Sequence, residues 1–205
     1  MTRLRGLYAI TAPELTPGKE LLTACAQALA GGARLLQYRD KQASPALRLA
    51  RARQLRELTH AHNALFLIND DPALALACQA DGVHLGQGDT PLSEAREMLG
   101  AEAIIGITCH ASLALAEQAM AEGADYVAFG RFFHSYTKPG APAATVELLQ
   151  QARSAIALPR VAIGGVNADN APALINAGAD MLAVVHALFG AQDIHAAARQ
   201  LAELF

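Results

Sequence analysis

Two short apolar stretches of this chain each lead into an acidic residue, Asp70 in one case and Asp89 in the other. Just upstream, a third apolar stretch ends with two cations, Arg39 and Lys41. If the three stretches are neighbouring parallel strands, two carboxylates and two cations meet at one edge. This combination suits a magnesium-bound polyphosphate, because the metal takes carboxylate oxygens while Arg and Lys bind the remaining phosphate charge.

Helix capping is the structural alternative for an acid that follows a strand. The chain repeats a capping residue before a proline, which is favoured at the first helical position, at Thr16-Pro17, Ser44-Pro45, Asp71-Pro72 and Thr90-Pro91. With Asp71 and Thr90 predicted as caps, the two acids beside them are left for a ligand. Burial of those acids in ion pairs with the two cations stays an alternative, but the desolvation cost of such pairs favours a bound ligand.

Short apolar runs alternate with longer Ala- and Leu-rich segments along the whole chain. We predict strands at Gly6–Thr11, Leu35–Arg39, Leu65–Asn69, Gly82–Gly86, Ile104–Cys109, Tyr126–Gly130, Val161–Gly165 and Met181–His186. We predict helices at Gly18–Ala30, Pro45–His62, Pro72–Gln79, Leu92–Leu99, Leu113–Glu122, Val146–Ala157, Asn170–Ala177 and Ile194–Leu204. Eight strands that are each followed by a helix predict a closed parallel (β/α)8 barrel, a TIM barrel, formed by residues 1–205 as one domain.

A repeated glycine motif supports the barrel. Gly31-Gly32-Ala33-Arg34, Gly123-Ala124-Asp125 and Gly178-Ala179-Asp180 each stand between a helix end and the next strand, where glycine can supply the left-handed residue that ends a helix. An open doubly wound sheet is the alternative. That fold needs a glycine-rich nucleotide-binding turn after its first strand, and Thr11-Ala12-Pro13 is not such a turn.

In a barrel of this kind, the loops that follow the strands carry the function. Acids that precede strands, such as Asp81, Asp125 and Asp180, are therefore predicted to stabilise turns at the opposite end. The acids and cations that follow strands are the candidates for chemistry.

Side-chain alternation sorts the segment around Arg39. Gln37, Arg39 and Lys41 have the same parity and are predicted to point toward the barrel mouth, while Tyr38 and Asp40 point to the other side.

Two further loops are predicted to bind phosphate. The loop after the sixth strand holds Ser135, Thr137 and Lys138, whose hydroxyl and ammonium groups suit phosphate oxygens. Gly164 and Gly165 end the seventh strand, and loops after the seventh and eighth strands commonly bind phosphate through backbone N–H groups. The sequence thus predicts two anion sites, one metal-assisted near strands two to four and one metal-free at strands seven and eight.

The other polar residues of the predicted mouth are weaker candidates. His84 lies within a strand and is predicted to be a hydrogen-bonded core or rim residue rather than a metal ligand, and Cys109 is predicted to pack. His110 and His134 follow strands, but nothing in the sequence orients either as a general base. No Ser/His/Asp or Cys/His arrangement stands out.

Composition excludes several classes of protein. The chain has 205 residues, 53% of them hydrophobic, and a net charge of −3 with dispersed basic residues, which disfavours a nucleic-acid partner. Its three cysteines have no metal-ligand spacing and fit free thiols of a reducing cytoplasm. No apolar run approaches the ~18 residues of a membrane helix. We therefore expect a soluble cytoplasmic protein with small-molecule partners and no membrane; a homo-oligomer is compatible with the sequence.

Five segments, in order over nearly the whole chain, resemble the signature segments of the thiamine phosphate synthase family. They are Gln37-Tyr38-Arg39-Asp40-Lys41, Ile68-Asn69-Asp70, Asp81-Gly82-Val83-His84-Leu85-Gly86-Gln87-Gly88-Asp89, Ser135-Tyr136-Thr137-Lys138 and Ala162-Ile163-Gly164-Gly165. The resemblance implies a (β/α)8 transferase that joins hydroxymethylpyrimidine diphosphate to hydroxyethylthiazole phosphate, giving thiamine phosphate and diphosphate. In this family the diphosphate is thought to leave before the thiazole nitrogen attacks.

The resemblance also implies roles for individual residues. Asp70 and Asp89 would hold one Mg²⁺ per subunit, and Arg39, Lys41 and Lys138 would act on the diphosphate as the catalytic cations. Three residues would lie around the pyrimidine substrate: Gln37, Asn69 and Thr108. The thiazole phosphate site would be lined by Ser135, Tyr136, Thr137, Gly165 and the backbone of Val185 and His186. Tyr38 and Asp40 are further predicted substrate-binding positions.

Three positions depart from the family pattern. Thr108 stands where Ser is common and Ser135 where Thr is common, and both keep a hydroxyl group. His186 replaces a frequent Ser at the phosphate end of the eighth strand, a change that is tolerated if only the backbone there binds phosphate.

Two other functions are compatible with the same fold. A thiazole tautomerase-like enzyme would bind a thiazole phosphate without the diphosphate substrate, and a ligand-sensing regulatory barrel would lack catalysis. Neither has a clear need for Asp70 and Asp89 together with Arg39 and Lys41.

Overall fold

Eight parallel strands close into one barrel in the computed structural model, which describes residues 4–134 and 143–205. The strands are β1 (Gly6–Ile10), β2 (Leu35–Tyr38), β3 (Leu65–Asn69), β4 (Gly82–Leu85), β5 (Ile104–His110), β6 (Tyr126–Gly130), β7 (Arg160–Ile163) and β8 (Met181–Val184). Each strand pairs with its neighbours in sequence, and β1 pairs with β8. The predicted TIM barrel is confirmed, and the open doubly wound sheet is excluded.

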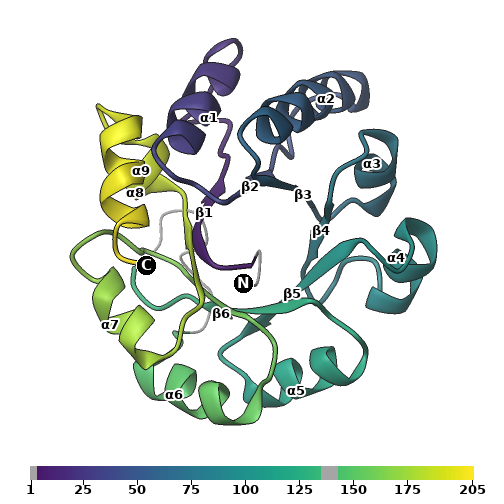
Figure 1. The fold of residues 1–205 in the computed structure, drawn as a ribbon. Coiled ribbons are helices and arrows are strands. Elements are labelled where there is room, and N and C mark those ends of the chain that lie inside the picture. The colour runs from purple at the N-terminus through teal and green to yellow at the C-terminus, as the bar shows by residue number, and fades with distance from the viewer. Residues whose placement is uncertain (1–3, 135–142) are drawn as a thin grey trace.

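Helices surround the strands on the outside of the barrel (Figure 1). They are α1 (Glu20–Ala30), α2 (Pro45–Ala61), α3 (Pro72–Ala77), α4 (Leu92–Leu99), α5 (Leu113–Ala121), α6 (Val146–Ala155), α7 (Ala171–Ala177), α8 (His186–Phe189) and α9 (Ile194–Ala202). The predicted boundaries differ from these by a few residues. The short α8, which begins where the eighth strand was predicted to end, was not predicted.

Two apolar cores stabilise the barrel. The larger lies between the strands and the helices and contains residues such as Phe66 and Leu182. The smaller fills the barrel interior and includes Tyr8, Leu67 and Tyr126. Near-continuous burial along β1, β2 and β6 explains why these strands read as unbroken apolar runs.

The register brings the three stretches that carry the acids and cations side by side. Tyr38 of β2 lies opposite Ile68 of β3, and Asn69 of β3 lies opposite His84 of β4. The predicted adjacency of the two acids and the two cations is therefore confirmed at one edge. We call this edge, where the strands end, the carboxyl-terminal rim.

Acids at the opposite end of the barrel have the predicted structural role. Asp81 accepts a hydrogen bond from the Phe66 N–H at 2.7 Å, so it ties the start of β4 to β3. Asp125 binds the Ile105 N–H at 2.8 Å in the same way between β6 and β5. Each of these acids also forms an ion pair with an arginine.

The predicted helix caps are half right. Ser44 and Asp71 accept hydrogen bonds from the backbone N–H groups of Leu47 and Leu74, respectively, as helix caps do. Thr16 and Thr90 do not cap: the Thr16 hydroxyl donates to the Ala12 carbonyl, and α4 begins after Pro91 without a side-chain cap. The physical reason is the chain path, which enters α1 and α4 one or more residues later than the proline spacing indicates.

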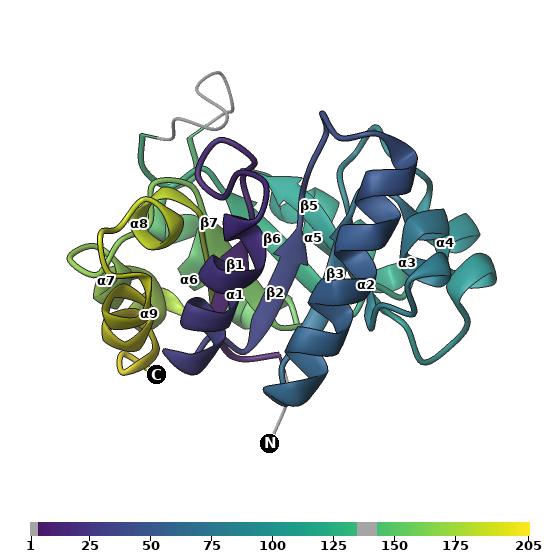
Figure 2. The same cartoon turned by 90° about the horizontal axis from the view of Figure 1, so that it is seen from above.

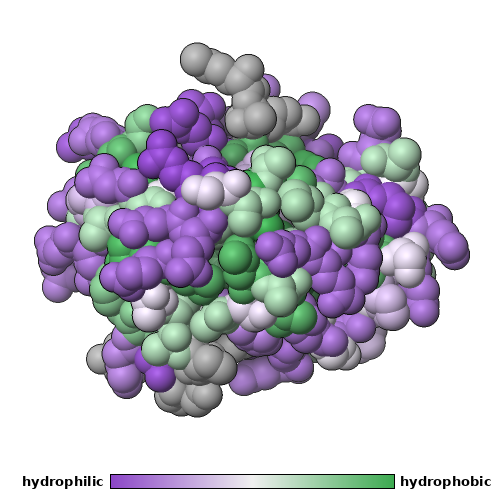
Figure 3. Space-filling view, turned by 90° about the horizontal axis from the view of Figure 1, so that it is seen from below, coloured by the Kyte–Doolittle hydropathy of each residue, from purple (hydrophilic) through white to green (hydrophobic). Residues whose placement is uncertain are grey.

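Within the described residues, no helix is long and apolar enough to cross a membrane. Figure 2 shows the barrel from one side and Figure 3 from the opposite side, where hydrophilic and apolar residues are interspersed. In the described part of the chain, three large apolar side chains are exposed, Leu47, Leu76 and Met98, and each lies on a different helix.

Candidate active site

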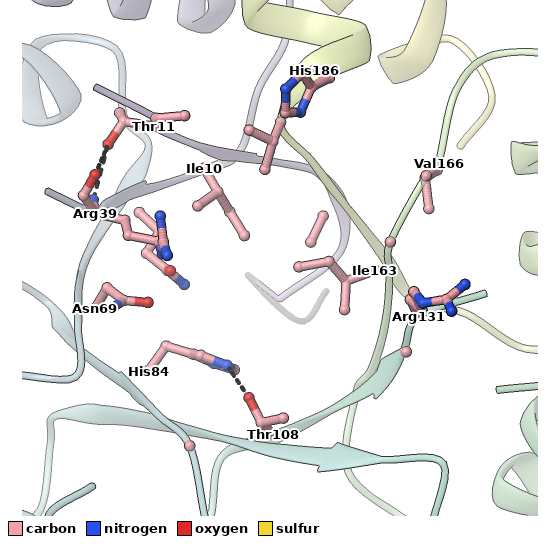
Figure 4. A pocket seen from close by; sticks show the side chains of 18 of the residues that line it. Ile10, Thr11, Arg39, Asn69, His84, Thr108, Arg131, Ile163, Val166 and His186 are labelled. Carbon is pink, nitrogen blue, oxygen red and sulfur yellow. Dashed lines mark hydrogen bonds between the residues drawn. The ribbon is translucent and has the colours of Figure 1, made fainter. Parts of the chain in front are cut away.

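A cavity of about 780 Å³ opens at the carboxyl-terminal rim. All eight strands or the residues just after them contribute to its lining, so residues far apart in the sequence converge on one space (Figure 4). Most of the predicted site residues lie here: Gln37, Arg39, Lys41, Asn69, Asp70, Asp89, Thr108, Gly165, Val185 and His186.

Two residues of the predicted substrate-binding segment do not line this cavity. Tyr38 and Asp40 are buried on the outer side of the barrel, as side-chain alternation predicted. Asp40 pairs with Arg51 of α2 at 2.8 Å and accepts the backbone N–H groups of Gln42 and Ala43. Their geometry supports the shape of the loop after β2 rather than contact with substrate.

The predicted residues Ser135, Tyr136, Thr137 and Lys138 lie outside the described residues. Their roles in phosphate binding stay predictions.

The two rim acids contact each other and a cation. Lys41 Nζ lies 2.7 Å from Asp70 Oδ2, and the Gly86 N–H donates to Asp89 Oδ2 at 2.7 Å. The carboxyl groups of Asp70 and Asp89 are close enough that each affects the pKa of the other. Two neighbouring carboxyl groups that both carry charge repel each other, and a proton or a cation relieves that repulsion.

The electrostatics of the two acids differ. Burial raises the pKa of Asp70, but its hydrogen bonds with Lys41 and Asp89 outweigh burial, and the pKa lies below the ordinary value. Burial and the neighbouring Asp70 carboxylate raise the pKa of Asp89, although the Gly86 N–H works in the opposite direction. Asp70 is therefore the more easily ionised of the two acids, and a nearby cation favours ionisation of Asp89 as well.

Asp70 has a backbone conformation that is unusual for a residue with a side chain. Its φ is +63°, in the left-handed region, and its N–H donates to the His84 carbonyl at 2.9 Å. Aspartate tolerates this region better than most residues, and such outliers concentrate at functional sites. The conformation turns Asp70 toward β4, where Asp89 follows.

This donor set fits a magnesium ion. In the described part of the chain, no group of three or more His, Cys, Asp or Glu side chains is placed to hold a metal. Magnesium does not require such a group, because it keeps several waters and commonly uses one or two carboxylates together with substrate phosphates. Asp70 and Asp89, which both line the cavity, match that requirement.

Deeper in the cavity, five side chains form one hydrogen-bonded chain across the barrel. It runs from Gln37 to Tyr8, from Tyr8 to Tyr126 at 2.9 Å, from Tyr126 to His84 at 2.8 Å, and from His84 to Thr108 at 2.9 Å. Both ring nitrogens of His84 are used within the chain, which confirms the prediction of a hydrogen-bonded core histidine. The contact between His84 and Thr108 is drawn in Figure 4.

The rim at β7 and β8 has the predicted glycine pair. Gly164 and Gly165 have φ values of +100° and +67°, and a Cβ atom at either would overlap Arg131 or His134. Glycine therefore lets the backbone after β7 pass close to the loop after β6. Val185 and His186 lie on the same rim, at the start of α8.

Sequence reasoning missed several polar residues of the cavity, among them Thr11 and Arg131. Thr11 follows β1; its Oγ1 accepts the Arg39 N–H at 2.9 Å and donates to the Arg39 carbonyl at 3.2 Å, so it fixes the backbone of a predicted catalytic cation. Arg131 follows β6 and lies across the cavity from Arg39 (Figure 4). The available signal was position, because Thr11 ends the first predicted strand and Arg131 directly follows the sixth.

Comparisons with known proteins give a consistent picture. A family model described as thiamine monophosphate synthase matches residues 7–188. A thiamine-phosphate synthase of Alcanivorax borkumensis is 60% identical over 206 residues, covering 99% of this chain and 95% of the relative. A thiamine-phosphate synthase of Thioalkalivibrio sulfidiphilus is 58% identical over 204 residues, covering 99% and 96%.

Solved structures agree with the sequence comparisons. A thiamine phosphate pyrophosphorylase from Pyrococcus furiosus superposes with a TM-score of 0.90 at 36% identity, covering 98% of this chain and 95% of that chain. A 3-hexulose-6-phosphate synthase superposes with a TM-score of 0.68 at 17% identity, covering 98% and 99%, which shows a shared fold.

Proposed function

The chain belongs to the thiamine monophosphate synthase family, and from that premise we propose how its cavity divides the work of the reaction. It is a transferase that couples hydroxymethylpyrimidine diphosphate with hydroxyethylthiazole phosphate to give thiamine phosphate and diphosphate. The observation that carries the division of roles is the convergence of two acids and two cations on one rim of the cavity.

We propose that one Mg²⁺ per chain is held by Asp70 and Asp89. When bound, the ion supplies positive charge that neutralises the leaving diphosphate. Both acids line the cavity, and the Asp70 carboxylate contributes to the raised pKa of Asp89, which supports this assignment because a cation there would relieve their repulsion.

We propose that Arg39 and Lys41 bind the diphosphate oxygens that the Mg²⁺ ion does not contact. Thr11 holds the Arg39 backbone at the rim, and Lys41 reaches Asp70 at 2.7 Å, so both cations stand beside the proposed metal site. Lys138 is proposed as a third cation on the strength of the family resemblance alone. Charge-assisted contacts of this kind stabilise the departing diphosphate more than the bound substrate.

The pyrimidine ring is proposed to bind deeper in the cavity, against Gln37, Asn69 and Thr108. Gln37 is buried, and it and Thr108 are the two ends of the hydrogen-bonded chain. The thiazole phosphate is proposed to bind at Gly165 and at the backbone of Val185 and His186, with Ser135, Tyr136 and Thr137 assigned there by resemblance. Gly165 supports this site because it lines the cavity at this rim, on the same side as Val185 and His186.

This chemistry needs little proton transfer by the protein. A diphosphate that is neutralised by cations is a weak base and leaves without a general acid. The main work of the side chains is to hold two phosphorylated substrates in line. The tautomerase-like and regulatory alternatives are not supported, since both full-length relatives are thiamine-phosphate synthases.

We also propose that residues 1–205 act as one domain, that the protein works in the cytoplasm, and that a homo-oligomer is compatible with this fold. All three cysteines are free and buried, which supports a reducing compartment.

The direct test is to incubate the purified protein with Mg²⁺ and both substrates and to measure thiamine phosphate. We expect Asp70→Ala and Asp89→Ala to lower the Mg²⁺-dependent rate at least about 100-fold, because each removes a metal ligand and leaves the diphosphate charge less neutralised. Melting temperature verifies that the variants fold.

Asp71→Asn is the matched control. It changes the neighbouring acid but keeps an oxygen that caps α3, so near-normal turnover is expected. Near-normal turnover of the Asp70 and Asp89 variants instead would refute the metal assignment.

A further inference from the structure

His110, the last residue of β5, has a backbone conformation that residues with a side chain rarely adopt. Its φ is +49°, in the left-handed region. In the described part of the chain, four non-glycine residues have a positive φ. Asn63 and Gln79 follow α2 and α3, where a left-handed residue commonly ends a helix, whereas Asp70 and His110 line the cavity. Helix termination therefore does not explain the conformation of His110, and such outliers concentrate at functional sites.

A β-bulge accompanies this conformation. Thr108 of β5 lies opposite Ala128 of β6, but the next residue of β6, Phe129, lies opposite His110. Cys109 is thus the extra residue of the bulge. Bulges occur next to active sites, where they change the direction in which a side chain points.

The bulge and the left-handed residue together turn His110 into the cavity. Residues that pair across neighbouring strands point to the same face of the sheet. Phe129 packs in the larger core between strands and helices, so a regular strand would direct its partner there as well. His110 lines the cavity instead, and among the described residues its ring has no hydrogen-bond or ion-pair partner. By contrast, both ring nitrogens of His84 are hydrogen-bonded. The fold therefore directs the His110 imidazole toward a ligand.

The position of His110 matches the proposed diphosphate site. Thr108, two residues earlier on β5, is at the depth proposed for the pyrimidine ring. A strand advances about 3.3 Å per residue, so His110 lies roughly 5–7 Å nearer the mouth, at the level of a group attached to that ring. The proposed metal ligands Asp70 and Asp89 follow β3 and β4, and His110 continues this row of rim groups onto β5. The glycine pair of the proposed thiazole phosphate site follows β7, which is further away along the rim.

We propose that His110 is a catalytic residue that donates a ring N–H to the diphosphate. The inference rests on the proposed placement of the diphosphate beside Asp70 and Asp89. An imidazole carries an N–H in its neutral and its charged form, so it can donate in either. When the C–O bond between the methylene carbon and the diphosphate breaks, its electron pair stays with the diphosphate. The added negative charge strengthens the hydrogen bond, and the proton stays on His110.

The first test measures ligand affinity by calorimetry, with Mg²⁺ and inorganic diphosphate as the probe. His110→Asn removes the imidazole and keeps a residue type that tolerates the left-handed region. We expect the affinity for the probe to fall at least about tenfold, the effect of losing a hydrogen bond to a charged group. Affinity for thiazole phosphate should change by less than about twofold. His195→Asn makes the same substitution at an exposed position of α9 and should keep both affinities.

Turnover should respond more strongly than binding, because the hydrogen bond strengthens as charge develops on the diphosphate. We expect kcat of His110→Asn to fall at least about 30-fold.

His110→Gly separates the role of the ring from that of the backbone. Glycine adopts a positive φ without strain, which offsets the contacts that the ring loses, so the ligand-free variant should melt within about 3 °C of the native protein. Its affinity for Mg²⁺ with diphosphate should fall as in His110→Asn. A large fall in melting temperature with native diphosphate affinity would show that the ring stabilises the fold, and would overturn the inference.

A measurement on the native protein covers the case in which the variants do not fold. In nitrogen-15 NMR, diphosphate with Mg²⁺ should shift the ring signals of His110 relative to Mg²⁺ alone, and thiazole phosphate should leave them nearly unchanged. Signals that move only with thiazole phosphate, or with neither ligand, contradict the proposed contact. A native protein that binds no diphosphate and forms no thiamine phosphate overturns the proposed function instead, so the two failures are distinguishable.

Discussion

At the rim of this barrel, residues that are adjacent in the sequence have different structural roles. Asp70 faces the cavity in a left-handed conformation, while the adjacent Asp71 caps α3 and pairs with Arg48 at 3.0 Å. Lys41 faces the same cavity, while the adjacent Asp40 is buried against Arg51. Alternating side-chain direction thus separates a residue that meets substrate from one that shapes the loop.

The buried pair of Asp40 and Arg51 gives a prediction about pH. Burial raises the pKa of Asp40, but the N–H groups of Ala43 and Gln42 and the charge of Arg51 outweigh burial and lower the pKa. A lowered folded-state pKa contributes stability that is present above the unfolded value of about 3.9 and is lost as pH falls through the folded value. Asp40→Asn should therefore destabilise the protein at neutral pH but not at strongly acidic pH.

Urea unfolding at pH 7 and at about pH 3 measures the difference, which we expect to be about 2 kcal/mol or more at the higher pH and to shrink at the lower. Asp169→Asn removes an exposed acid and serves as the control. A pH-independent difference between native and Asp40→Asn protein would contradict the prediction.

At the scale of elements, the barrel ends differ in what their polar residues do. The end opposite the rim joins strands in pairs through acids: Asp81 for β3 and β4, Asp125 for β5 and β6, and Asp180 for β7 and β8. The repeated glycine motif precedes two of these acids, and Gly123 and Gly178 have positive φ values that end α5 and α7. Stability devices and binding devices therefore occupy opposite ends of the same strands.

Asp180 is the place to test that separation. It accepts the Arg160 N–H at 2.8 Å and pairs with Arg160 Nη2 at 2.8 Å. We expect Asp180→Ala to lower the free energy of unfolding by about 2–4 kcal/mol, because a strand N–H and a half-buried guanidinium both lose a partner. Chemical denaturation measures the loss, and kcat and KM at a temperature where the variant is folded should stay within about twofold of native values. A large change in KM with unchanged stability would show that the two ends are coupled.

At the scale of the whole molecule, one cavity brings together two places for anions. The acids and cations of β2, β3 and β4 lie on one side of the rim, and the glycine pair after β7 with the start of α8 lies on the other. Closure of the sheet is what puts these two places around one space of about 780 Å³, large enough for both substrates.

Ligand-linked stability tests the two places separately. Ligands that bind only the folded protein stabilise it by about 2.7 kcal/mol at 100 times Kd, which corresponds to a melting shift of about 5–10 °C for a chain of this size. We expect Mg²⁺ with diphosphate to produce such a shift in the native protein and little shift in Asp70→Ala. Thiazole phosphate should stabilise both proteins about equally. If Asp70→Ala abolishes the effect of both ligands, the two places are not independent.

The sequence by itself determined the strand and helix pattern, and therefore the barrel, because apolar periodicity and capping residues act locally. It also placed Asp70, Asp89, Arg39 and Lys41 at one rim, since parallel strands that are consecutive in a closed barrel end side by side. Only the tertiary structure showed that Thr90, a predicted cap, does not cap α4, and that His186 begins a short helix. Likewise, the chain from Gln37 through Tyr8 and Tyr126 to Thr108 joins strands that are not neighbours, and only closure of the barrel brings those side chains within hydrogen-bond distance.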